Sequence, residues 1–131
     1  MTSHIVPWLT VGMGFLISVA LAVGGFGVKE PAQNTELTFV ARDMAFHLGG
    51  RVEANPEIHL PQGGRLILTL RNDDQGIQHE LRIPALGIQT QVLEGGEEDR
   101  IELIPKHAGT FAYFCELHPE MMRGTLIVAK K

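Results

Sequence analysis

Hydrophobic residues recur at every second position along much of the chain. Leu66, Leu68 and Leu70 follow this pattern, and Ile101 and Leu103 repeat it. A period of two is typical of a β-strand that turns one face toward a core. The pattern predicts short strands at 36–41, 44–48, 57–60, 65–71, 80–83, 89–93, 100–104, 110–115 and 125–129.

Glycine, proline and polar residues separate these segments, for example at 49–50, 61–64, 72–76, 94–96 and 106–109. Many short strands with such turns between them indicate an all-β domain, an antiparallel sandwich or barrel. We find no amphipathic helix of useful length and no internal repeat.

The first part of the chain differs from the rest, because no Asp, Glu, Lys or Arg precedes Lys29. As a helix, residues 5–28 would be about 36 Å long, enough to cross a hydrocarbon core of about 30 Å. Trp8 lies near one end, where an indole suits the membrane interface. We therefore expect an N-terminal membrane anchor at 1–28, a polar linker at 29–34 and one domain at 35–131.

A cleaved signal peptide is the alternative, since Ala20-Leu21-Ala22 has the small-x-small form of a cleavage site. No Lys or Arg precedes the apolar run, and its length favours a retained anchor. Lys29 beside Glu30 indicates orientation only weakly.

Composition excludes several classes of function. A net charge of -4 argues against nonspecific nucleic-acid binding, which needs clustered Lys and Arg. The single cysteine excludes an internal disulfide, a four-cysteine zinc site and any centre with two thiolates. No Ser/His/Asp arrangement or paired acid and base indicates a hydrolase.

The chemistry lies in residues 113–124, which join two predicted strands. Cys115 closes one strand, His118 and Pro119 follow, and Met121 and Met122 precede the next strand. Two soft sulfurs and an imidazole suit copper, particularly Cu(I), better than magnesium or calcium. His79, which follows the 72–76 turn, is the best candidate for a further ligand.

These residues resemble the cupredoxin family, the small blue-copper proteins of plastocyanin, amicyanin and azurin type. The resemblance covers about residues 35–131 and is strongest at 68–73 before His79, at 109–115, at 118–119 and at 122–124. It implies an antiparallel Greek-key β-sandwich with one copper ion near one end. It also implies that His79, Cys115, His118 and a weak axial methionine bind this ion.

The axial methionine has two candidates. Counted from His118, Met121 fits the amicyanin-like spacing and Met122 fits the azurin-like spacing. Arg123-Gly124 favours Met122, since family members often have a basic or small residue and then glycine at this point.

Two residues depart from the family pattern. Glu80 follows His79 and Glu116 follows Cys115, at positions where relatives often carry Asn and Ser or Thr. Those polar side chains tie the two ligand loops together in relatives. Two carboxylates would need a proton or a third group to do so, and we expect both to point to solvent.

Residues 79–87 also resemble the copper domain of cytochrome oxidase subunit II, as does an anchor followed by a sandwich. That subunit's dinuclear centre needs two cysteines, so Cys115 alone predicts a mononuclear site.

The function that this resemblance implies is a membrane-anchored carrier of single electrons, with its copper domain on the extracytoplasmic (periplasmic or extracellular) side. Its partners would be cytochromes or a membrane oxidoreductase complex, respiratory or photosynthetic. Near His118, an apolar rim would be formed by Pro84, Ala85, Leu86 and Pro119. The alternatives are a copper-delivery or copper-holding protein, a structural zinc site or no metal at all, or an oxidase subunit that has lost one copper.

Overall fold

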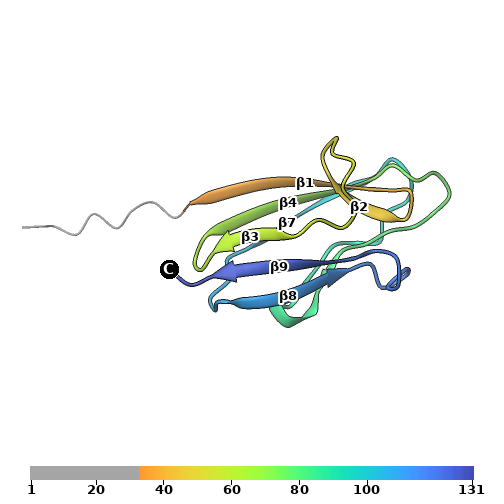
Figure 1. The fold of residues 1–131 in the computed structure, drawn as a ribbon. Coiled ribbons are helices and arrows are strands. Elements are labelled where there is room, and N and C mark those ends of the chain that lie inside the picture. Colours follow the sequence, from red (N-terminus) through yellow and green to blue (C-terminus); the bar gives the residue numbers. More distant parts are fainter. Residues whose placement is uncertain (1–32) are drawn as a thin grey trace, which may run out of the picture.

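The computed structural model describes residues 33–131, which form two β-sheets packed face to face (Figure 1). One sheet has the order β2-β1-β4-β7, built from β1 (Asn34–Arg42), β2 (Ala45–Leu48), β4 (Arg65–Asn72) and β7 (Glu98–Leu103). The other has the order β3-β9-β8-β5-β6, built from β3 (Ile58–Pro61), β5 (Arg82–Ile83), β6 (Ile88–Gln89), β8 (Gly109–Phe114) and β9 (Arg123–Ala129). The all-β prediction is confirmed for this part of the chain.

A short 3₁₀ helix, η1 (Pro84–Leu86), joins β5 to β6. Across residues 33–131, no helix has the length and apolar character needed to span a bilayer. The predicted anchor at 1–28 and residues 29–32 of the predicted linker lie outside the described residues.

The prediction of an antiparallel sandwich holds for most strand pairs and is wrong for two of them. β1 pairs with β4 in parallel, and β3 pairs with β9 in parallel. Parallel neighbours need a long crossover, and here the intervening chain supplies it through strands of both sheets. Alternation along one strand does not reveal which distant strand will become its neighbour.

The predicted strand at 89–93 is also wrong in extent, because β6 ends at Gln89. The side chain of Thr90 interrupts the pairing: its Oγ1 accepts the backbone N–H of Leu81 at 2.9 Å. Beyond this point only an isolated bridge between His79 and Leu93 remains. The segment that carries His79 is therefore held by this bridge and a few separate hydrogen bonds instead of a regular ladder.

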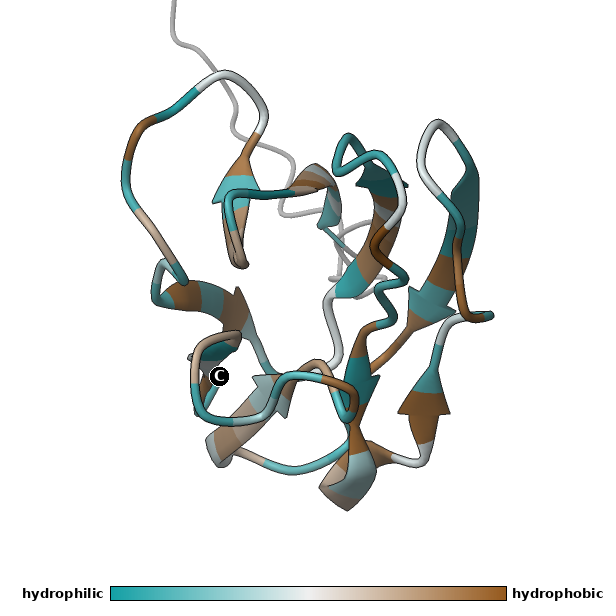
Figure 2. Cartoon of the chain, turned by 90° about the vertical axis from the view of Figure 1, so that its right-hand side faces the viewer, coloured by the Kyte–Doolittle hydropathy of each residue, from teal (hydrophilic) through white to brown (hydrophobic). Residues whose placement is uncertain are grey.

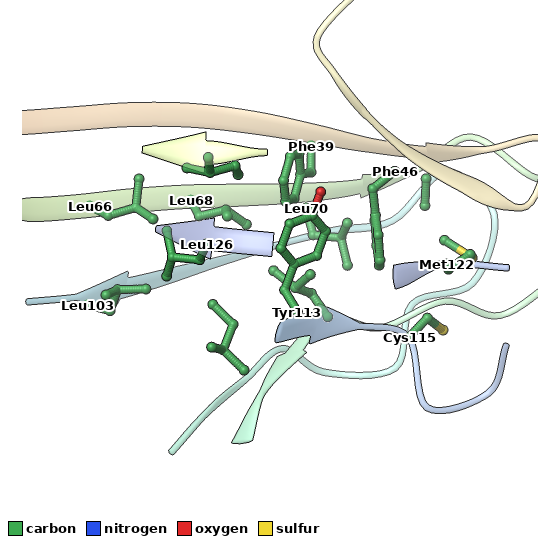
Figure 3. Packing of buried hydrophobic residues seen from close by; sticks show 14 of the residues in the cluster. Phe39, Phe46, Leu66, Leu68, Leu70, Leu103, Tyr113, Cys115, Met122 and Leu126 are labelled. Atoms are coloured by element: carbon green, nitrogen blue, oxygen red, sulfur yellow. The ribbon is translucent and has the colours of Figure 1, made fainter. Parts of the chain in front are cut away.

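Three aromatic rings fill the centre between the sheets (Figure 3). Phe39 and Phe46 lie 5.6 Å apart between ring centroids, and Tyr113 lies 5.2 Å from Phe39. Leu66, Leu68 and Leu70 are buried on the inner face of β4, as their spacing predicts. Figure 2 shows apolar and polar bands in turn along the strands.

The loops after β4 and after β8 meet at one end of the sandwich, on the right in Figure 1 and facing the viewer in Figure 2. Asn72, fully buried at the end of β4, shapes the first loop. Its Nδ2 donates to the carbonyls of Ile77 at 2.7 Å and Leu93 at 2.9 Å, and its Oδ1 accepts the Asp74 N–H at 2.9 Å. These hydrogen bonds fix the conformation of the segment between Asn72 and His79.

Candidate metal centre

The loop after β8 closes on itself. The N–H of His118 donates to the Cys115 carbonyl at 3.2 Å, and the N–H of Met122 donates to the His118 carbonyl at 3.0 Å. The N–H of Cys115 donates in turn to the Met122 carbonyl at 3.0 Å. The turn that Cys115 and His118 need in order to converge is therefore present.

His79 reaches the same place from the other loop. Its backbone exchanges two hydrogen bonds with Leu93, at 3.1 and 2.8 Å, and its ring is fully buried. Nε2 lies 2.8 Å from Oδ2 of Asp74, whereas Nδ1 is buried without any hydrogen-bond partner.

Three of the four predicted ligands lie together. The candidate donor atoms of His79, Cys115 and His118 all lie within 4.8 Å of one another. Sγ of Cys115 is 3.7 Å from Nδ1 of His118, and the two imidazole rings lie 5.1 Å apart between centroids at 62°. Segments distant in sequence thus bring a thiol and two imidazoles to one point.

The two methionines differ sharply in burial. Met122 is fully buried in the same apolar cluster as Cys115, and Figure 3 shows both at the end of the core beyond Phe46. The side chain of Met121 is 58% exposed, and its carbonyl accepts a hydrogen bond from Asn55 at 2.8 Å. This difference favours Met122 as the fourth donor.

The donor set fits one soft metal ion. The carboxylate of Asp74 only accepts hydrogen bonds, so Nε2 of His79 carries the ring proton and Nδ1 presents its lone pair. A buried nitrogen without a partner is costly, and ligation to a metal would satisfy it. A thiolate, two imidazoles and a thioether together suit copper.

The surroundings of His118 and Asp74 shift the pKa values of both groups downward. Burial lowers the pKa of His118, the neighbouring His79 lowers it further, and Asp74 acts in the opposite direction. Burial alone would raise the pKa of Asp74, but hydrogen bonds from His79 and from the N–H groups of Asp43 and Met44 hold it below its ordinary value. His118 is thus favoured as a neutral imidazole and Asp74 as a carboxylate.

The expectation that Glu80 and Glu116 both point to solvent is wrong for Glu80, which is 2% exposed. Arg82 donates from Nε to Glu80 at 2.8 Å and places Nη1 2.5 Å from Glu116. The guanidinium is therefore a third group that joins the two carboxylates. Sequence reasoning missed this role because Arg82 carries no ligand chemistry of its own.

The expected apolar rim is also different. Ala85 and Leu86 line a hollow with Lys106 and His107, which precede β8, whereas Cys115 follows β8. The hollow beside His118 is lined instead by the apolar Ile77 and Leu117, together with Gly76 and the polar side chains of Gln78 and Glu94. The sequence places Asp74 only in the predicted 72–76 turn and indicates no role for Ile77.

Comparison with known proteins decides the family. A family model described as a cupredoxin-like domain matches residues 16–128. This chain belongs to the cupredoxin family. No curated protein sequence matches this cupredoxin.

Solved structures give the same fold. Rusticyanin from Thiobacillus ferrooxidans is 19% identical, with a TM-score of 0.60 over 76% of this chain and 79% of its own. A heme-copper terminal oxidase dimer contains a chain that is 19% identical, with a TM-score of 0.62 over 78% of this cupredoxin and 68% of that chain. Auracyanin A, a "blue" copper protein from Chloroflexus aurantiacus, is 16% identical, with a TM-score of 0.59 over 73% of this chain and 99% of its own. At these identities the likeness concerns the fold alone.

Proposed function

We propose that this cupredoxin is a mononuclear type 1 (blue) copper protein that carries single electrons between redox partners. The clustering of the donor atoms of His79, Cys115 and His118 within 4.8 Å carries the proposal. Copper bound there would supply the Cu(I)/Cu(II) couple.

The chain's own contribution is a prearranged set of ligands. The backbone hydrogen bonds that close the 115–122 loop, and those between His79 and Leu93, fix the positions of the residues that would bind the metal. Cys115, His79 and Met122 are fully buried, so the surroundings exclude water and resist rearrangement. A site that moves little when its charge changes suits rapid electron transfer.

His118 is the ligand nearest to solvent, because it is half-buried and lines a surface hollow with Ile77 and Leu117. We propose that electrons enter and leave through this imidazole edge. The hollow combines the apolar Ile77 and Leu117 with the polar Gln78 and Glu94, and a small mixed surface of this kind suits the weak contacts of redox encounters, which must separate quickly.

We further propose that residues 5–28 anchor the protein in a membrane, with the copper domain on the extracytoplasmic side. The support is the uncharged length of that segment. A tether raises the local concentration of the carrier near a membrane-bound partner such as an oxidoreductase complex or a cytochrome. If the segment is cleaved, the same domain would be a soluble periplasmic carrier.

The direct test is an optical and paramagnetic-resonance spectrum of the oxidised, copper-loaded protein, with a measured reduction potential. We expect an intense visible band, one copper per chain and reversible reduction. Cys115→Ser should abolish the band. A colourless protein that prefers zinc would indicate a structural role instead of electron transfer. Ready release of copper to an acceptor would indicate a delivery role.

The anchor is tested separately by expressing the full chain. We expect it in the membrane fraction, resistant to extraction with high salt and carbonate. A soluble product that begins after residue 22 would show signal-peptide cleavage instead.

A further inference from the structure

Each of two predicted ligands is followed directly by a glutamate, and Arg82 joins these glutamates. Nε of Arg82 donates to Oε1 of Glu80 at 2.8 Å, and Nη1 lies 2.5 Å from Oε2 of Glu116. We call this Glu80–Arg82–Glu116 contact the arginine bridge.

Strand pairing sets the position of the arginine bridge. Arg82 in β5 lies opposite Phe114 in β8, so it stands beside the point where β8 gives way to Cys115. Glu80 and Arg82 are two residues apart, the spacing at which side chains of an extended chain share a face. One guanidinium therefore contacts both the segment that carries His79 and the loop that carries Cys115.

The burial of Glu80 shows that the bridge is built into the fold. Its side chain is 2% exposed, whereas Arg82 is 32% and Glu116 is 55% exposed. A buried carboxylate is costly unless a countercharge pairs with it, and Arg82 is the cation in contact with it. The planar guanidinium offers several N–H donors in a fixed fork, so it can hold two carboxylates at a set separation.

We propose that Arg82 is a positioning residue for the metal centre, which fixes the separation of His79 and Cys115 through Glu80 and Glu116. This inference rests on the proposed copper function. The arginine bridge joins the two ligand-bearing segments by ion pairs. The positive charge of Arg82 explains how glutamates can occupy the positions directly after His79 and Cys115.

Arg82→Met tests the bridge, because methionine keeps the apolar stem and removes every donor. We expect copper(I) to be released faster to a chelator and its affinity to fall by up to about 10- to 100-fold, the range known for changes around metal ligands. The reduction potential and the paramagnetic-resonance parameters should change with it. Arg82→Lys keeps the charge without the fork and should give an intermediate release rate.

Arg65→Met is the matched control. Arg65 makes an equally close pair with Glu102, at 2.6 Å for both contacts, between β4 and β7 of the other sheet. We expect this variant to keep the wild-type release rate, spectrum and potential, even where its thermal unfolding temperature falls.

Glu116→Ala keeps the inference testable if Arg82→Met does not fold. Glu116 is more than half exposed, so this variant should fold, and it removes the oxygen that Arg82 contacts, so it should release copper faster and show an altered spectrum. Wild-type spectra, potentials and release rates in Glu116→Ala, or in a folded Arg82→Met, would overturn the positioning role. A wild-type protein without the visible band contradicts the proposed function, whereas a blue wild type with unaffected variants contradicts only this inference.

Discussion

The two ring nitrogens of His79 have different surroundings, because only Nε2 is hydrogen-bonded to Asp74. Nε2 donates to the carboxylate of Asp74 at 2.8 Å, and Nδ1 of the same ring is buried without a partner. The carboxylate is itself held by the backbone N–H groups of Asp43 at 2.9 Å and Met44 at 3.5 Å. The ring is therefore fixed in the tautomer and orientation that a metal ligand requires.

Asp74→Asn should raise the reduction potential of the copper-loaded protein. The negative carboxylate stabilises the more highly charged oxidised state, and its removal should cost that state on the order of 1 kcal/mol, or about 40 mV. Protein-film voltammetry would measure the shift. Asp73→Asn is the matched neighbour, since Asp73 pairs with Arg71 at the surface at 2.7 Å. Equal shifts in the two variants would show that the potential depends on the net charge of the protein and not on the contact between Asp74 and His79.

Met122→Leu should alter the visible and paramagnetic-resonance spectra strongly, while Met121→Leu should leave them unchanged. The reason is that Met122 is fully buried beside Cys115, whereas Met121 is 58% exposed. Exchange of Met for Leu keeps volume and should cost less than about 1.5 kcal/mol of stability, so a spectral change would not reflect unfolding. The reverse outcome would assign the axial position to Met121.

Gly124→Ala should destabilise the metal-free protein by about 1–3 kcal/mol, the usual cost of overpacking. Gly124 lies opposite Tyr113 in the β8–β9 pair, and an added Cβ would collide with the tyrosine ring. Chemical denaturation would measure the loss. Gly50→Ala is the control, because nothing lies within 4 Å of its added Cβ. Similar losses for both variants would contradict a steric cause.

Tyr113 should not ionise at its ordinary pH. Burial, and to a lesser extent Glu53, raises its pKa well above 10.0, and its hydroxyl donates to the Pro56 carbonyl at 2.5 Å. A raised folded-state pKa gives stability that is complete below the unfolded value, near pH 10, and is lost as pH rises above it. Tyr113 is the sole tyrosine, so ultraviolet titration reports on it alone. A phenolate signal near pH 10 from the folded protein would refute this.

The local features of this cupredoxin follow from its sequence. The period of two in 65–71 and 100–104 predicts strands because alternate side chains face one core. Cys115, His118 and the following methionines predict a soft metal site, because donor type and loop length are properties of one short segment. The position of His79 before a strand and after a turn was enough to propose it as the distant ligand.

Other features depend on which distant segments pack together, and only the tertiary structure decided these. The parallel pairing of β1 with β4 and of β3 with β9 arises from crossovers that alternation does not encode. Met122 is buried and Met121 is exposed because of the way the 115–122 loop packs against the hydrophobic core. Glu80 is buried because Arg82 neutralises it, since the free energy of a charge depends on the surroundings that the whole fold places around it.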